Sequence, residues 1–339
     1  MFSSLARAAA CAVLFAPLPL FAQQAGDAPA SGIYRVNGLI ENPNLPQYID
    51  PYFAPPLVVK PRLNPIGQEP LPPAPAVPNQ SLTDFKLSQT YLPRVADNGF
   101  GTNDTEFSAQ FALPWEPCGK PILLRGGFGV HEWDGPRPKR ASVDPALPGA
   151  VYDLYADIGW KPRPAEWLFF DLGITPGIYS DFHSLNADAF RLRGRALSIV
   201  ALSEKFQFVG GVLYVNRNGP KVVPAGGFIW QPHEATKFQI VFPQPKISQR
   251  VCTVGDKAWW LYLAGEFGGG TWAYERPDGS NTSADYNDYR LIVGSELRRA
   301  DGWNLRAEVG YVFGRSIDPL NTPRIHPADT MMARLSLNY

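Results

Sequence analysis

The last ten residues of the chain, Thr330 to Tyr339, read TMMARLSLNY and decide the fold class. Successive side chains of an extended strand point to opposite faces. One face here holds Met331, Ala333, Leu335, Leu337 and Tyr339, and the other holds Met332, Arg334, Ser336 and Asn338. An apolar face opposite a polar face is typical of a barrel strand with lipid outside and a polar lumen inside. A half-buried strand of a soluble β-sandwich alternates in the same way, so repetition must decide between the two.

The same alternation recurs along the chain from residue 82 onward, without any helical period. The segments are 85–92, 105–113, 122–133, 151–161, 167–180, 190–202, 205–215, 222–231, 236–242, 259–272, 289–298 and 303–314. The prolines of FPQPK (242–246) favour a turn, so residues 236–251 cross twice. The pattern predicts an all-β fold, a closed antiparallel transmembrane β-barrel of about fourteen strands, with twelve as the fallback. Long connections are expected at 93–103, 134–150, 181–188, 275–285 and 315–329.

The N-terminal part of the chain divides into two segments before the barrel. Residues 1–22 are predicted to be a signal peptide, because Arg7 precedes a short apolar stretch and Ala22 offers a small residue for cleavage. Residues 23–81 are predicted to be a disordered or semi-rigid periplasmic linker, because twelve prolines lie between Pro43 and Pro78. The barrel is expected to occupy residues 82–339.

Charged residues of the predicted strands fall on the face opposite the apolar one. The acids are Glu106, Asp153, Asp157, Asp171, Glu266, Glu296 and Glu308, and the bases are Arg191, Arg193, Arg195, Lys237, Arg290, Arg298, Arg306 and Arg334. A charge facing lipid near the bilayer midplane costs about 2–4 kcal/mol, so these side chains are expected to line the lumen. Seven acids against eight bases predict a paired network and weak ion selectivity in any pore.

The sequence predicts neither an enzyme nor a cofactor-binding or metal-binding protein. Its four histidines, His131, His183, His233 and His326, lack metal-ligand spacing. The remaining catalytic alternative is a hydrolase at the outer rim that uses His183 with Ser180 or Ser184, although neighbours in sequence do not establish triad geometry. A net charge of zero indicates no nucleic-acid partner.

The sequence also supports predictions for the cysteines and the tryptophans. Cys118 and Cys252 are both expected on the periplasmic side, and the predicted strand order places them on roughly opposite sides of the barrel, so their pairing is left open. Tryptophans near strand ends are expected at the two membrane interfaces, where the ring is in contact with lipid and the N–H with water. They are Trp160, Trp167, Trp259, Trp260, Trp272 and Trp303.

Several blocks of the chain resemble a known family. They are GFGVHEWDGP (127–136), TPGIYSDF (175–182), PAGGFIWQPHEATKFQIVFPQPKISQRV (224–251), WWLYLAGEFGGGTWAYERPDG (259–279) and EVGYVFGR (308–315). In that order they are similar to a bacterial outer-membrane β-barrel domain of unknown function found in planctomycete-type genomes, over residues 100–339. The resemblance implies a barrel in the cell outer membrane and brings no substrate, catalytic residue or cofactor.

Two functions follow as hypotheses from the predicted barrel. The first is a channel or transporter for small solutes, and the second is a structural or adhesive envelope barrel without an open pore. Fourteen strands lie between small barrels with filled interiors and porins with aqueous channels, so the strand count does not choose between them. The expected partners are outer-membrane lipid and the barrel-assembly machinery, which would read the C-terminal strand ending in Tyr339.

Overall fold

The structure is a computed structural model that describes residues 82–136, 146–219, 221–299 and 302–339. The predicted signal peptide (1–22) and the predicted linker (23–81) lie outside the described residues. Within those ranges, no helix is long and apolar enough to cross a membrane.

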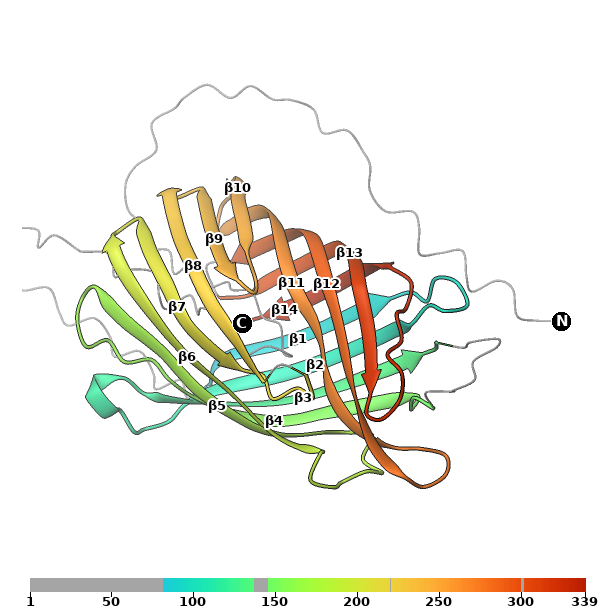
Figure 1. The fold of residues 1–339 in the computed structure, drawn as a ribbon. Coiled ribbons are helices and arrows are strands. Elements are labelled where there is room, and N and C mark those ends of the chain that lie inside the picture. The colour runs from blue at the N-terminus through green and yellow to red at the C-terminus, as the bar shows by residue number, and fades with distance from the viewer. Residues whose placement is uncertain (1–81, 137–145, 220, 300–301) are drawn as a thin grey trace, which may run out of the picture. The chain divides into compact units, whose positions relative to one another are not determined.

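The described chain forms a closed barrel of fourteen strands in sequence order, with β1 pairing β14 to complete the ring (Figure 1). Every neighbouring pair is antiparallel, as short hairpin connections require. The strands are β1 (Leu82–Leu92), β2 (Gly101–Ala112), β3 (Ile122–Asp134), β4 (Ala150–Trp160), β5 (Leu168–Ser180), β6 (Phe190–Ser203), β7 (Phe206–Tyr214), β8 (Val222–His233), β9 (Thr236–Phe242), β10 (Lys246–Val254), β11 (Lys257–Glu275), β12 (Asn281–Arg299), β13 (Asn304–Pro319) and β14 (Thr330–Asn338). A single 3-10 turn, η2 (Pro117–Gly119), lies between β2 and β3.

The predicted fold class is confirmed, including the tight hairpin between β9 and β10. Two predicted long connections are wrong, because β11 continues to Glu275, β12 begins at Asn281 and β13 continues to Pro319. The segment NTSADYND (281–288) is mostly polar and therefore resembles a loop in sequence. Its backbone nevertheless pairs with β11 and β13, so hydrogen bonding along the ladder overrides the side-chain pattern.

The outer face of the barrel is apolar. Between the strand ends it exposes Leu87, Leu154, Ile158, Ile174, Leu192, Val212, Leu261, Leu263, Leu291, Val293, Leu305, Val309 and Leu335. A soluble protein rarely exposes so large a continuous apolar surface. The outer surface is therefore suited to contact with an apolar environment.

Rows of aromatic rings border this apolar surface. At the end carrying the chain termini, Phe85, Trp303 and Tyr339 pack together, with ring centroids 5.0–6.4 Å apart. On the other side, Tyr289 packs between Phe267 and Phe313 at 4.6 and 5.7 Å. Phe313 lies ten residues after Trp303. At ~3.3 Å per residue and a tilt of ~45°, the rows are roughly 23 Å apart, close to the ~25 Å band of outer-membrane barrels.

The expectation for the six tryptophans is wrong for two of them. Trp167 and Trp259 are 56% and 49% exposed on the outside, but Trp260 and Trp272 are 5% and 2% exposed and point into the barrel. Adjacent positions in a strand face opposite sides, so Trp259 and Trp260 could not both face lipid.

Apolar side chains fill a large part of the interior. One buried cluster lines the arc from β5 to β9 and includes Leu197, Leu213 and Ile229. A second lies at the mouth opposite the termini and consists of Phe100, Trp133, Val151, Tyr179, Trp272, Tyr274, Ala284, Tyr286 and Ile317. The interior is therefore packed with side chains over these regions and has no continuous polar lining.

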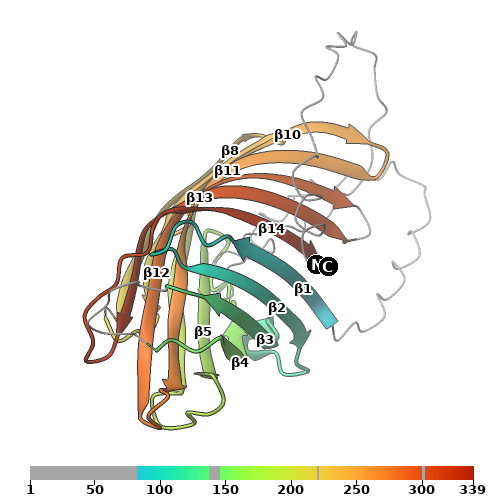
Figure 2. The same ribbon diagram turned by 90° about the vertical axis from the view of Figure 1, so that its right-hand side faces the viewer.

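Three neighbouring strands bend at one level, above the outer aromatic row. Gly269 of β11 has a φ of +91°, its partner Asn287 lies at a register shift in β12, and Gly314 of β13 has a φ of +58°. Positive φ favours glycine because it has no Cβ. Beyond the bend lies the strand extension, which we define as residues 268–275, 281–288 and 314–319. Figure 2 shows β12 turning away from the direction of the other strands at this level.

Substituting Gly269 with alanine is expected to destabilise the barrel by about 1–3 kcal/mol, because a Cβ would enter a positive-φ site. It would also clash with the carbonyl oxygen of Tyr286. Gly126→Ala is the matched control, since no heavy atom lies within 4 Å of its Cβ position. Urea unfolding of both variants in detergent measures the difference, and equal stabilities would contradict a constraint at the bend.

Candidate functional site: the lumen charge network and the closed mouth

The structure places all fifteen predicted lumen residues on the inner side of the wall. Eleven of them are buried, namely Asp153, Asp157, Asp171, Arg191, Arg193, Arg195, Glu266, Arg290, Glu296, Arg306 and Glu308. The other four, Glu106, Lys237, Arg298 and Arg334, are half-buried. Buried charges require partners, and eleven of the fifteen residues fall into three clusters.

The first cluster centres on Arg195 of β6. Its guanidinium lies 2.8 Å from Asp157 of β4 and 2.7 Å from Asp171 of β5. The predicted pairing of strand β6 with the two preceding strands therefore occurs at this arginine. Arg193 instead stacks 3.9 Å over the ring of Tyr179, and Arg191 donates to the carbonyl oxygen of Asn216.

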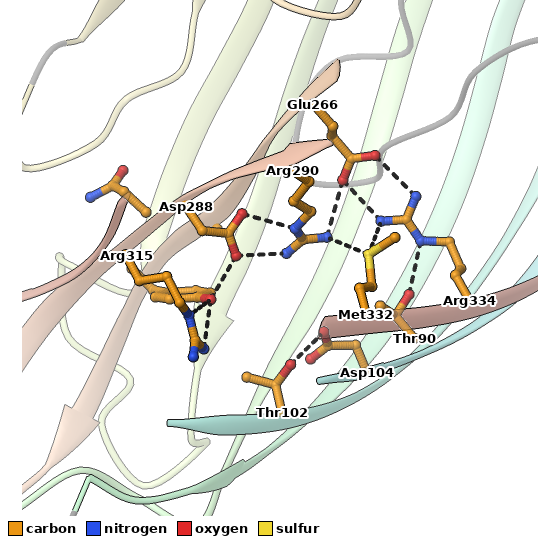
Figure 3. A network of polar contacts seen from close by, with 12 residues as sticks. Thr90, Thr102, Asp104, Glu266, Asp288, Arg290, Arg315, Met332 and Arg334 are labelled. Carbon is orange, nitrogen blue, oxygen red and sulfur yellow. Dashed lines mark hydrogen bonds and ion pairs between the residues drawn. The ribbon is translucent and has the colours of Figure 1, made fainter. Parts of the chain in front are cut away.

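The second cluster joins β11, β12, β13 and β14 (Figure 3). Glu266 accepts from Arg290 at 3.0 Å and from Arg334 at 2.9 Å. Arg334 also pairs with Glu308 at 3.1 Å. Each carboxylate of this cluster is thus shared between strands that are close in the ring, and the ion pairs tie the inner face of the wall together.

The second cluster continues into the strand extension through residues that the strand pattern did not predict to line the lumen. Arg290 also pairs with Asp288 at 2.8 Å, and Asp288 accepts from the Tyr286 hydroxyl at 2.6 Å. Arg315 donates to that hydroxyl at 3.0 Å and to the carbonyl oxygen of Phe100 at 2.6 Å. This chain of bonds crosses the bend and holds the extension in place (Figure 3).

The third cluster lies nearer the termini and surrounds Glu296 of β12. Arg298 donates twice to this carboxylate, at 2.9 and 3.0 Å. Lys246 of β10 lies 3.3 Å away and Arg306 of β13 lies 4.0 Å away. Lys237 of β9 lies on the same inner face.

The mouth opposite the termini is closed by direct contact between distant walls. Ala273 of β11 forms a parallel bridge with Ser180 of β5. The amide of Asp181 donates to the carbonyl oxygen of Ala273 at 3.1 Å, and the amide of Glu275 donates to the Asp181 carboxylate at 3.0 Å. Because β5 and β11 are far apart in the ring, this contact divides the mouth into two arcs, one through β6–β10 and one through β12–β14 and β1–β4.

A second link crosses the mouth beside this bridge. The indole N–H of Trp272 donates to Asp153 of β4 at 2.5 Å. Asp153 also lies 3.5 Å from the His131 ring, whose other nitrogen is 3.0 Å from Asp104. His131 is thus a buried residue of the inner wall.

The loop between β7 and β8 closes the remaining arc. Arg217 donates to the carbonyl oxygen of Gly269 at 2.9 Å and to the side chain of Asn287. The amides of Asn218 and Gly219 donate to the Asp285 carboxylate at 3.2 and 3.0 Å. Burial lowers the pKa of Arg217 to about 10, and nearby positive charge acts in the same direction. The group still carries its charge at neutral pH.

The hydrolase alternative has no geometric support at the predicted residues. The Ser180 hydroxyl is buried and donates to the carbonyl oxygen of Ser184 at 2.5 Å. His183 is 78% exposed, and its ring contacts the neighbouring Asp181. A serine nucleophile needs a histidine within hydrogen-bonding reach, and neither serine has one in the described contacts.

Cys118 in η2 and Cys252 in β10 are free and exposed. Across the residues that the structure describes, no group of three or more His, Cys, Asp and Glu side chains is arranged to hold a metal ion.

Four of the inward charges that the strand pattern did not predict have a common cause. Lys246 was read as part of a turn, while Asp285, Asp288 and Arg315 fall in segments read as loops. All four lie in strands. The alternation of inward and outward side chains continues through these strands, but prolines and short polar residues make it hard to recognise in the sequence.

Residues 165–319 match a domain of unknown function, DUF6268, which spans β5 to the end of β13. No curated protein matches the chain. Among solved structures, a bacterial polysaccharide outer membrane secretin has 11% identity and a TM-score of 0.39, over 76% of this chain and 98% of that one. LpxR from Salmonella typhimurium has 7% identity and a TM-score of 0.37, over 76% of this chain and 99% of that one. OccAB4 from Acinetobacter baumannii has 12% identity and a TM-score of 0.28, over 78% of this chain and 99% of that one. Likenesses this weak support no conclusion about the function of this chain.

Replacing Arg195 with methionine is expected to destabilise the barrel by about 3–5 kcal/mol, because Asp157 and Asp171 would stay buried without their cation. Adding Asp157→Asn and Asp171→Asn should recover most of that loss. The control is Arg324→Met, whose pair with Asp318 is exposed and is expected to contribute less than ~1 kcal/mol. Denaturant unfolding measures all three, and equal effects at Arg195 and Arg324 would contradict a structural role for the first cluster.

Proposed function

We propose that this chain is an outer-membrane β-barrel whose lumen is closed in its resting state, and that it serves the envelope as a barrel without a constitutive pore. The membrane part of the proposal is supported by the apolar outer face and its bordering aromatic rows. Their roughly 23 Å separation fits an outer-membrane band.

The closure is supported by one observation above others, the bridge between Ala273 of β11 and Ser180 of β5. A wide aqueous pore keeps opposite walls apart, whereas here two walls share backbone hydrogen bonds. The lumen charges point the same way, because Asp171 and Glu296 are 0% exposed and Arg306 is 3% exposed. Residues that line an open channel are wetted.

A gated channel for small solutes is the second candidate. The inner face carries ion-pair clusters on β4–β6 and on β10–β14, and these polar stretches would suit small hydrophilic solutes. Passage would require the strand extension to leave β5 and the loop between β7 and β8 to leave Asp285.

The C-terminal strand is proposed to be the segment that the barrel-assembly machinery reads. Tyr339 lies on the closing seam, where its amide donates to the carbonyl oxygen of Phe85 at 2.9 Å and its carbonyl accepts from the amide of Phe85 at 3.2 Å. The last residue therefore completes the ring, and a partner that holds it would control closure.

Placing an arginine on the outer face tests the membrane assignment. Val309 is 58% exposed and lies midway between the aromatic rows, so Val309→Arg is expected to cost about 2–4 kcal/mol in lipid vesicles. Leu305 is also exposed but lies near Trp303, so Leu305→Arg is expected to cost only ~0–1 kcal/mol. A depth-independent cost in vesicle unfolding titrations would argue against a bilayer around this surface.

Planar-bilayer recording tests the closure. The wild-type barrel is expected to give no steady open-channel current, because the mouth is bridged. A variant in which residues 271–285 are replaced by a two-residue turn loses both Trp272 and the bridge, and it is expected to conduct. The control shortens only the exposed turn at 277–279. Heat-modifiable gel migration confirms that each variant is folded, and a large steady current from the wild type would refute the closed barrel.

A further inference from the structure

The third cluster holds more positive charge than its single carboxylate can neutralise. We define the basic cluster as Lys237 of β9, Lys246 of β10, Arg298 of β12 and Arg306 of β13, gathered on the inner face around Glu296. Among the described residues, Lys237, Lys246 and Arg298 by themselves bring three side-chain cations to this one carboxylate, a formal surplus of two positive charges.

The neighbouring acids do not offset this surplus, because other cations engage them. Glu308, which follows Arg306 on the same face of β13, pairs with Arg334 at 3.1 Å and accepts from the Tyr262 hydroxyl at 2.6 Å. Glu266 is shared between Arg290 and Arg334. Positive charge gathered in a desolvated site is unfavourable unless an anion balances it.

An independent feature of the same place is Trp260 of β11. It is 5% exposed, and its indole N–H is buried without a hydrogen-bond partner. The guanidinium of Arg298 lies 4.5 Å from the centre of its ring, and Glu296 faces it across the ladder. A buried N–H group normally donates to an acceptor. The basic cluster therefore contains a donor that could bind an acceptor atom of a ligand.

Access to the basic cluster runs from the end of the barrel that carries the termini. Side-chain exposure falls from 32% at Arg250 to 11% at Arg298 and 2% at Lys246. Arg250 belongs to β10 and its guanidinium lies 5.9 Å from the Trp260 ring. A solute from this side would meet Arg250 first and Lys246 last, and the opposite mouth is closed.

We propose that the basic cluster and the Trp260 N–H form a binding site for an oxyanion, the phosphate or carboxylate group of a small solute that enters from the end carrying the termini. The oxyanion accepts hydrogen bonds from Lys237, Arg298 and the indole, and it balances the surplus charge. The site goes beyond the closed-barrel proposal, because binding from one end needs no open path through the lumen.

Calorimetric titration of inorganic phosphate into the purified full-length barrel in detergent tests this site, at physiological chloride so that nonspecific attraction is screened. We expect saturable binding of one phosphate per chain. Lys246→Gln is expected to weaken it about tenfold, because it removes one of the positive charges that surround the bound anion. Glu296→Gln should strengthen it by a similar factor, because it removes the carboxylate that competes with the anion for Lys246 and Arg298.

Lys237→Gln is the second weakening variant and covers the case in which Lys246→Gln does not fold. Lys205→Gln is the matched control, because Lys205 is an exposed lysine in the turn between β6 and β7 at the same end of the barrel. Far-UV circular dichroism and heat-modifiable migration establish the fold of each variant. Absence of saturable heat in the wild type, or equal weakening by Lys205→Gln and by the cluster variants, overturns the site.

Discussion

Closure of the hydrogen-bonded ring is the constraint on which the rest of the structure depends. β1 pairs β14 over residues Lys86–Tyr91, so no strand edge is left at the seam. Once the ring is closed, each strand side chain must face either outward or inward. The apolar residues gather on the outside, and the charges are forced into a confined interior in which each needs a partner.

The interior meets that need unevenly. Around Arg195, Glu266 and Arg334 the acids and bases match, and the ion pairs bind neighbouring strands to one another. Around Glu296 they do not match, and bases dominate. A balanced total therefore conceals a local surplus, and local charge governs which ions and ligands a lumen accepts.

The closed mouth follows from a bend shared by three strands. Gly269 and Gly314 adopt positive φ angles, and β12 carries an irregularity between them. These features redirect the strand extension until β11 meets β5, and the ion-pair chain from Arg290 to Arg315 fixes it there. A continuous sheet thus supplies its own closure, with aromatic rings from both walls packed beneath it.

Period-two alternation by itself predicted the fold class and the inward direction of the fifteen charges, because it is a local property of an extended chain. The prolines of 242–246 indicated the hairpin between β9 and β10. The alternation did not reveal the strand extension, since residues 281–288 are mostly polar and are held by ladder bonds and by the burial of Ala284 and Tyr286 in the cluster at the mouth. The contact of Trp272 with Asp153 joins residues 119 positions apart, and the crowding of Lys237, Lys246 and Arg306 around Glu296 depends equally on strand register and curvature. Only the closed tertiary structure decides such contacts, because they arise across the lumen and not along a strand.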